Sequence, residues 1–352
     1  MWMAWIGHAY MAADGAYREA TEILDRALEL GREHGSTKVI AYAQAWRVYT
    51  LWWLGRIDEA VAAGEEGSAL FAALPDEPYV WFKARCGVGM VFATMGKFEE
   101  ATEIGDELIA FGGRSGSARS KAMGHLVHIN VANLAVDEPA TGVHARAILE
   151  ATIDPIYEHS PVPRLFSLIA ADKVAEARSY HDDHYERYIV GLHLRLLAGF
   201  FAMADGALQI REGKPREGFA QLEAVEAAAV QSGEGIYQRY AGAMIAIAYA
   251  KVAMASPSVG YVFRNARFAA GRGRRPKKQA IARLTDLLSH LAEWGMEGLR
   301  FQLEWTLAQL LVHEGDAESA AAHLEAGIAA IEPAGNTEGL RTARAFLEQL
   351  RR

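Results

Sequence analysis

The residues with the clearest capacity for chemistry are two pairs of histidines. His181 and His184 lie three residues apart beside Asp182 and Asp183, and His125 and His128 repeat that spacing. Residues three apart share a helix face, but a metal needs a third ligand, and no HExxH motif occurs. We interpret the first pair as a solvated helix face and the second as polar residues between packed helices. The alternatives are a metal site and a ligand-contacting stripe.

Nucleotide and acyl-transfer chemistry find little support. The Gly-, Ser- and Arg-rich segment 112–121 could cradle a phosphate, but its lysine does not fit the P-loop pattern, so we interpret it as a loop ending in a serine N-cap. No GxSxG motif is present. Cys86, the single cysteine, excludes a disulfide and lies in an apolar stretch typical of a buried thiol. We therefore expect no catalytic residue, metal or cofactor, and no enzymatic activity.

Aromatic residues recur near the start of the chain, where they predict a binding groove. On a stack of helix pairs they fall at equivalent positions of the concave face, as peptide-groove anchors do. The predicted groove residues are Trp2, Trp5, Tyr42, Tyr49, Trp52, Lys83 and Met90. The alternative is that half of them are core, as we expect for Trp46 and Trp81.

A run of basic residues reverses the local charge of an otherwise acidic chain. The formal net charge is -8, which argues against a protein that coats nucleic acid. The run could bind an anionic surface, or it could be a solvated linker and helix start. Its members are Arg264, Arg267, Arg272, Arg274, Arg275, Lys277 and Lys278.

The elements that would position these residues are helices. Ala and Leu are abundant and alternating patterns are rare, which favours an all-α chain with helix in well over half of its residues. Three glycines about 40 residues apart, Gly15, Gly55 and Gly96, are each followed by a large residue and then a small one. Glycine ends one helix, and the small residue lets the next pack closely. Weaker copies begin at Asp137, Asp172, Gly213 and Gly315.

The repeat divides the chain into three parts of one continuous array: 1–112, the divergent segment 113–212, and 213–352 with a basic hinge near 256–278. We expect interruptions at 152–164 and 256–276. The expected helices are 1–13, 16–33, 37–54, 57–73, 78–95, 97–112, 117–135, 139–151, 163–171, 173–182, 184–212 with breaks near Gly191 and Gly199, 216–232, 235–255, 275–294, 297–314, 316–331 and 337–351.

The first expected helix is apolar around its whole circumference. Trp2, Trp5 and Ile6 cannot all be covered by one repeat behind them, so residues 1–13 predict self-association or contact with an upstream domain. No apolar run is long enough to span a membrane, and no basic residue precedes this one as a secretory signal requires. We expect a cytoplasmic protein.

The glycine-based motif resembles tetratricopeptide (TPR) repeats. The C-terminal stretch, with its FxxRN-like hinge, the Gly295-Met296 turn and the late turn at Gly315 and Ala320, resembles the TPR-like region of bacterial class III adenylate/guanylate cyclases. The resemblance implies a right-handed α-solenoid of antiparallel helix pairs. It further implies a regulatory tail that cannot make a cyclic nucleotide alone.

Two functions follow from these patterns. The first is a non-enzymatic module for a protein or peptide partner, within a cyclase-type signalling protein. The second is a small-molecule sensor or enzyme with a cavity in segment 113–212. Convergence of polar groups on such a cavity would favour the second.

Overall fold

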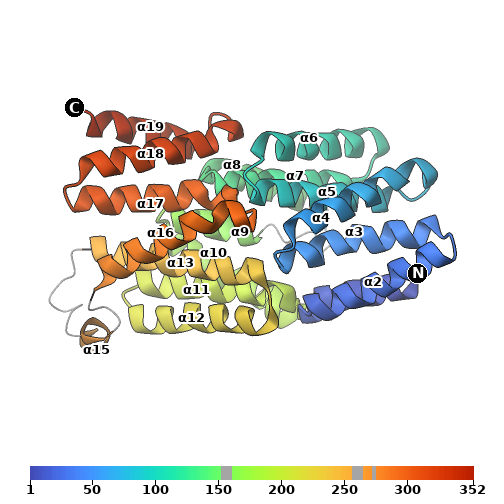
Figure 1. Cartoon of the computed structure of the whole chain (residues 1–352), viewed down its shortest axis with the longest axis horizontal. Coiled ribbons are helices and arrows are strands. Elements are labelled where there is room, and N and C mark those ends of the chain that lie inside the picture. Colours follow the sequence, from blue (N-terminus) through green and yellow to red (C-terminus); the bar gives the residue numbers. More distant parts are fainter. Residues whose placement is uncertain (152–160, 256–264, 272–274) are drawn as a thin grey trace.

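The computed structural model describes residues 1–151, 161–255, 265–271 and 275–352, and these residues form helices joined by turns, with no strand among them (Figure 1). Helix accounts for 86% of the structure, which confirms the all-α prediction. The main helices are α1 (Trp2–Ala9), α2 (Tyr17–Glu33), α3 (Thr37–Trp53), α4 (Ile57–Ala69), α5 (Pro78–Thr94), α6 (Phe98–Ser115), α7 (Ala118–Leu134), α8 (Glu138–Ala151), α9 (Pro161–Ala170), α10 (Val174–Tyr185), α11 (Ala198–Arg211), α12 (Pro215–Ser232), α13 (Gly235–Met254), α15 (Ala266–Ala270), α16 (Pro276–Trp294), α17 (Arg300–His313), α18 (Ala317–Ile331) and α19 (Glu338–Leu350).

Consecutive helices pack as hairpins in two layers. From α1 to α13 and from α16 to α19 each helix contacts the next one in the chain, and α13 contacts α16; α1, α3, α5, α7 and α9 also contact one another in order. Twelve of the 17 residues of α3 are buried, whereas α2 buries seven of its 17 along one face. Inner helices such as α3 are therefore buried around most of their circumference, while outer helices such as α2 are amphipathic.

The predicted glycine turns occupy equivalent places in three hairpins. Gly15, Gly55 and Gly96 have φ of 67°, 77° and 77°, the left-handed conformation that glycine adopts without a Cβ clash. The small residues that follow are Ala20, Ala60 and Ala101, and all three are fully buried against the preceding helix.

The α7–α8 turn corrects the predicted register by one residue. Val136, not Asp137, has the left-handed conformation, with φ of 53°. The Asp137 carboxylate instead accepts hydrogen bonds from two helix N-termini: its Oδ1 from Ala140 N (3.2 Å) and its Oδ2 from Glu338 N (3.2 Å). Capping two helices requires the aspartate just before α8, so the preceding valine takes the strained position. Asp172, with φ of 59°, matches its prediction.

The helical segment predicted over 184–212, with breaks near Gly191 and Gly199, is interrupted after Gly191 as expected. α10 continues into a π-helical turn, Glu186–Gly191, and then the chain leaves the helix, with His193 at φ of 55°. A short 3₁₀ turn, Arg195–Leu197, leads into α11, which begins at Ala198, next to the break predicted near Gly199. The interruption brings Arg195–Leu197 alongside the turn that ends in Asp14.

Two rows of hairpin turns from separate parts of the chain meet in the middle of the molecule, where the blue-to-cyan helices of Figure 1 adjoin the yellow-to-red helices. We call this contact the turn seam. A Cβ built on Gly235 would lie 3.0 Å from the Leu54 carbonyl oxygen, and one on Gly298 would lie 2.3 Å from that of Ala93. A Cβ on Gly339 would lie 2.3 Å from the Ala135 carbonyl oxygen. The seam therefore joins turns α3–α4, α5–α6 and α7–α8 to turns α12–α13, α16–α17 and α18–α19.

Asp137 should contribute to stability through both of its caps. We expect Asp137→Ala to lower the free energy of unfolding by about 2 kcal/mol, since each lost cap costs about 1 kcal/mol. The control is Asp316→Ala, because Asp316 caps only α18, through Ser319 N at 3.1 Å. Urea unfolding followed by circular dichroism compares the two. An equal loss in both variants would contradict the double-capping role.

Candidate ligand cavity

The predicted groove residues do not form an open concave face. Tyr42, Tyr49, Trp52, Lys83 and Met90 are all buried, while Trp2 and Trp5 are 83% and 41% exposed. The cause is the way that later helices cover α3 and α5. Trp53 stacks on Tyr237 of α13 at 4.9 Å between ring centroids and packs edge-on against Phe200 of α11 at 5.2 Å. The face predicted to be open is therefore part of the interior.

A cavity of about 170 Å³ lies where these helices converge. Its walls come from all three parts of the chain, and segment 113–212 supplies the largest share. The lining residues are Met11, Tyr49, Trp52, Trp53, Lys83, Cys86 and Met90; Met123, Leu126, Asn130, Asn133, Val162, Pro163, Phe166, Ile169, Ala170, Leu196, Leu197, Phe200 and Arg211; and Tyr240, Met244, Ile247 and Gln302. The cavity predicted for the middle segment is thus present, with walls that extend beyond it.

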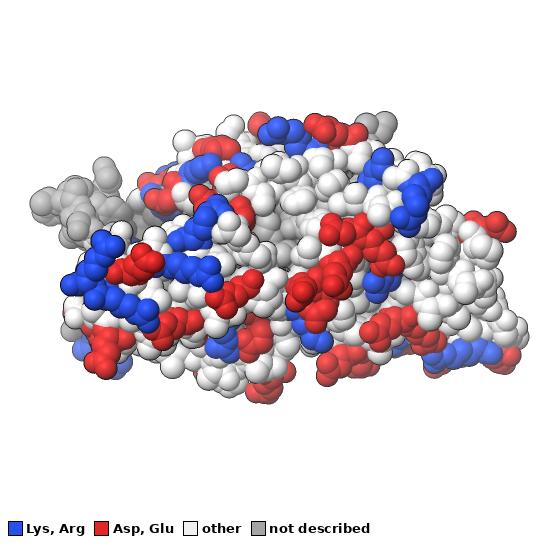
Figure 2. Space-filling view, turned by 90° about the horizontal axis from the view of Figure 1, so that it is seen from above, with Lys and Arg blue, Asp and Glu red and all other residues white. Residues whose placement is uncertain are grey.

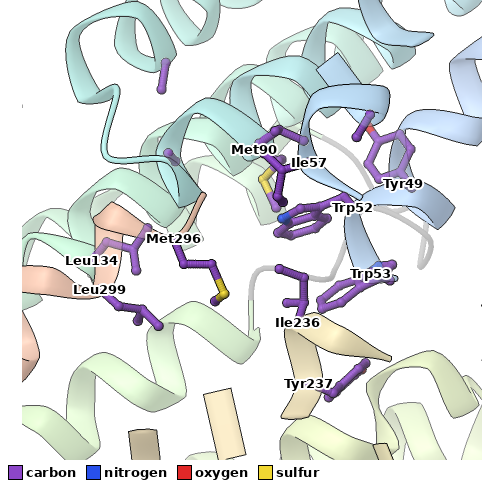
Figure 3. Packing of buried hydrophobic residues seen from close by; sticks show 14 of the residues in the cluster. Tyr49, Trp52, Trp53, Ile57, Met90, Leu134, Ile236, Tyr237, Met296 and Leu299 are labelled. Atoms are coloured by element: carbon purple, nitrogen blue, oxygen red, sulfur yellow. The ribbon is translucent and has the colours of Figure 1, made fainter. Parts of the chain in front are cut away.

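A hydrogen bond fixes the Trp52 side chain in the part of the cavity wall that α3 and α5 form. Trp52 Nε1 donates to Thr94 Oγ1 at 3.1 Å, which ties α3 to the end of α5. Figure 3 shows Trp52 and Trp53 pointing from α3 toward Ile236 and Tyr237 of α13, with Met90 beside Trp52. Rings held in this way give a rigid apolar surface.

Lys83 is the most unusual residue of the cavity. It is 6% exposed, and its ammonium group lies 3.9 Å from the centroid of the Tyr49 ring and 4.6 Å from that of Trp46. Among the described residues, no carboxylate lies within ion-pair distance of Nζ and no hydrogen bond involves it. Burial lowers the pKa of Lys83 to about 8, which the neighbouring Cys86 partly offsets. The two ring faces and the neighbouring Cys86 thiol balance only part of the lost hydration of this cation.

The other polar side chains of the cavity are held by hydrogen bonds to the protein. Asn130 Nδ2 donates to the Leu126 carbonyl at 2.8 Å, and Gln302 Nε2 donates to the Asn133 carbonyl at 2.9 Å. Arg211, at the end of α11, donates to Asp172 at 3.3 Å, and burial lowers its pKa. Of the described residues that line the cavity, none is Asp or Glu. The described lining therefore combines apolar walls with two cations and no carboxylate.

The histidine pairs lie elsewhere. His181 is buried, and its Nε2 lies 3.2 Å from the Phe201 carbonyl, so the solvated face predicted for it is wrong; packing of α10 on α11 covers it. His125 and His128 do lie between helices, as predicted: His125 faces His144 with 3.1 Å between their Nδ1 atoms, and His128 contacts Asp106 at 3.0 Å. Within the described ranges, no three His, Cys, Asp or Glu residues are arranged to hold a metal.

Two further sequence interpretations agree with the structure. Cys86 is fully buried, and burial raises the pKa of its thiol. In the segment 112–121, Ser117 caps α7 by accepting a hydrogen bond from Ser120 N at 3.2 Å, although α6 extends to Ser115 and leaves only a short loop.

The described part of the basic run is dispersed. Arg264, Arg272 and Arg274 lie outside the described residues. Lys277 forms an ion pair with Glu314, while Arg267, Arg275 and Lys278 are exposed. Phe268, next to Arg267, is buried on Phe219 of α12 with ring centroids 5.4 Å apart. The face seen in Figure 2 carries separate groups of Lys and Arg and of Asp and Glu, with an acidic group near its middle.

No family model and no curated protein matches the chain. Of the helices that the structure describes, none has the length and apolar character needed to cross a membrane.

Proposed function

We propose that this chain is a non-enzymatic regulatory module that senses a small, largely apolar molecule in its central cavity. Its frame is a right-handed TPR-type solenoid of antiparallel helix pairs, and its place is the cytoplasmic sensing tail of a cyclase-type signalling protein. The observation that carries the proposal is the cavity itself, because apolar walls with a few converging polar groups are the usual form of a ligand site.

The origin of the walls supports a sensing role. Trp52 comes from α3, Leu126 from α7 and Tyr240 from α13, so a bound molecule contacts parts of the chain that otherwise meet at the turn seam. A ligand that binds only the assembled arrangement stabilises it by mass action. Ligand binding in the cavity is thereby coupled to the stability of the turn seam.

Binding of a neutral probe tests this function. Phenylacetamide should bind saturably in titration calorimetry and raise the melting temperature with its concentration. Its signal should include a change in tryptophan fluorescence, since Trp52 and Trp53 line the cavity. Met244→Trp should abolish binding by filling the space, whereas Met95→Trp, outside the lining, should not. A wild-type protein that fails to bind would refute the proposal.

A second function, a protein contact through α1, rests on a separate observation. Trp2 is 83% exposed, and Ile6 and Tyr10 beside it are also exposed, an apolar surface that usually marks an interface. Trp5 contributes less, because its ring also packs on Tyr42 with centroids 5.8 Å apart. This surface favours self-association or contact with an upstream domain.

Trp2→Glu combined with Ile6→Glu should lower the mass of any oligomer in sedimentation velocity and leave helix content unchanged. Charged groups at these positions would need desolvation in the interface. Val143→Glu is the control, since Val143 is an exposed apolar residue on α8. A wild-type chain that stays monomeric at high concentration would exclude self-association.

A further inference from the structure

We propose that Lys83 is the counter-ion for the anionic group of the cavity's ligand, which is a small aromatic or short-chain carboxylic acid. This inference rests on the proposed function and adds the chemical class of the ligand. The carboxylate would bind at the Lys83 ammonium, and the apolar body would lie among the rings and methionines of the walls.

The first support is the lack of any other partner for Lys83. Lys83 is only 6% exposed, and it lines the cavity. No described carboxylate forms an ion pair with it. Removing one member of a buried ion pair is strongly destabilising, because the remaining charge has lost its water. Lys83 is likewise a buried charge without a carboxylate partner among the described residues, and a ligand carboxylate would supply the opposite charge.

The second support is the sign of the lining as a whole. The chain has 44 acidic and 36 basic residues, yet the described residues of the cavity wall include Lys83 and Arg211 and no acidic residue. Arg211 already donates to Asp172, which leaves Lys83 as the cation without a protein anion. A cationic ligand would be repelled here, and a neutral one would leave Lys83 unpaired. The charges therefore select an anion.

The third support is the volume of the cavity and the kind of side chains that line it. Its volume of about 170 Å³ is slightly larger than the apolar cavities of about 150 Å³ that take up benzene. Trp52, Trp53 and Phe200 offer ring surfaces, and Met90, Met123 and Met244 offer adaptable ones. One ring or a short chain with a carboxylate fits this volume.

The test compares phenylacetate with phenylacetamide, which has nearly the same shape and no charge. In the wild-type protein, phenylacetate should bind at least about tenfold more tightly, the effect of a charge-assisted hydrogen bond. Lys83→Met should remove that preference and leave phenylacetamide binding nearly unchanged. The control is Lys97→Met, because Lys97 also lies over an aromatic ring, Phe92, but is exposed and outside the cavity.

The outcomes separate this inference from the proposed function. Equal binding of both probes would overturn the role of Lys83 and retain the sensing cavity. A preference for phenylacetate that survives Lys83→Met would also overturn it, because Arg211 would then be the counter-ion. Failure of both probes to bind would refute the proposed function, and the inference with it. The comparison of probes uses the wild-type chain and so does not depend on the folding of a variant.

Discussion

Replacing Lys83 with methionine should make the folded chain more stable. Methionine keeps the length of the side chain and removes a buried charge that has no protein partner. The lowered pKa of Lys83, about 8 against its ordinary 10.5, corresponds to a gain of about 2 kcal/mol after allowance for the lost contacts with two aromatic rings. Lys97→Met, at an exposed position, should change stability little.

The gain should depend on pH in a defined direction. Between pH 8 and 10.5 the unfolded chain binds the proton of Lys83 more tightly than the folded chain, so wild-type stability rises with pH across this window. Below pH 8 both states are protonated, and the full penalty is present. The advantage of Lys83→Met should therefore be largest at neutral pH and shrink toward pH 10.5.

Urea unfolding of both proteins at several pH values measures this difference. The other titratable groups around Lys83 are Cys86 on its own helix, Tyr49 on α3 and His8 on α1, whose pKa burial lowers to about 3. The Cys86 thiol and His8 interact with the Lys83 charge, so Cys86→Ser in both backgrounds is the control for the thiol. A less stable Lys83→Met variant at neutral pH would show that the ammonium contributes to the fold.

Replacing Gly298 with alanine should destabilise the protein by about 3 kcal/mol, because the turn seam has no room for a methyl group. Gly298 is buried, and an added Cβ would lie 2.3 Å from the Ala93 carbonyl oxygen and 2.9 Å from that of Thr94. Both neighbours are backbone atoms, so relief requires the end of α5 and the α16–α17 turn to separate.

The control for Gly298→Ala is Gly113→Ala. Gly113 lies within α6, and nothing lies within 4 Å of an added Cβ, so alanine should stabilise the helix slightly. Thermal unfolding followed by circular dichroism compares these variants. Wild-type stability of Gly298→Ala would mean that the two rows of turns are loosely packed in solution.

Sequence patterns predict the local structure of this chain better than they predict the contacts between helices that lie far apart in the sequence. The turns at Gly15, Gly55 and Gly96 were predictable because a glycine followed by a large residue and then a small one is typical of a tight turn between two packed helices. Val136 escaped the same reasoning, since no local signal marks a valine that adopts this conformation so that Asp137 can cap two helices.

The cavity was predictable only in part. Tyr49, Trp52, Lys83 and Met90 were singled out correctly as neighbours, but they were assigned to an open face. An inner helix that is apolar on all sides, such as α13, is clearly buried, but its sequence does not say which helix it packs against. The packing of helices far apart in the sequence decides which residues cover the cavity. It brings Phe200, Tyr240 and the cation Arg211 into the wall.

The turn seam gives this array a property that open helical repeats lack. In an open array each repeat touches its neighbours, so folding can begin anywhere and spread, and contacts stay local in sequence. Here the Asp137 carboxylate bonds to an amide 201 positions later, near the end of the chain. During synthesis, α3 emerges long before α13, so Trp53 lacks its covering ring until Tyr237 has left the ribosome. The nascent N-terminal part therefore exposes apolar surface during synthesis, and the turn seam is complete only when the last hairpin has been made.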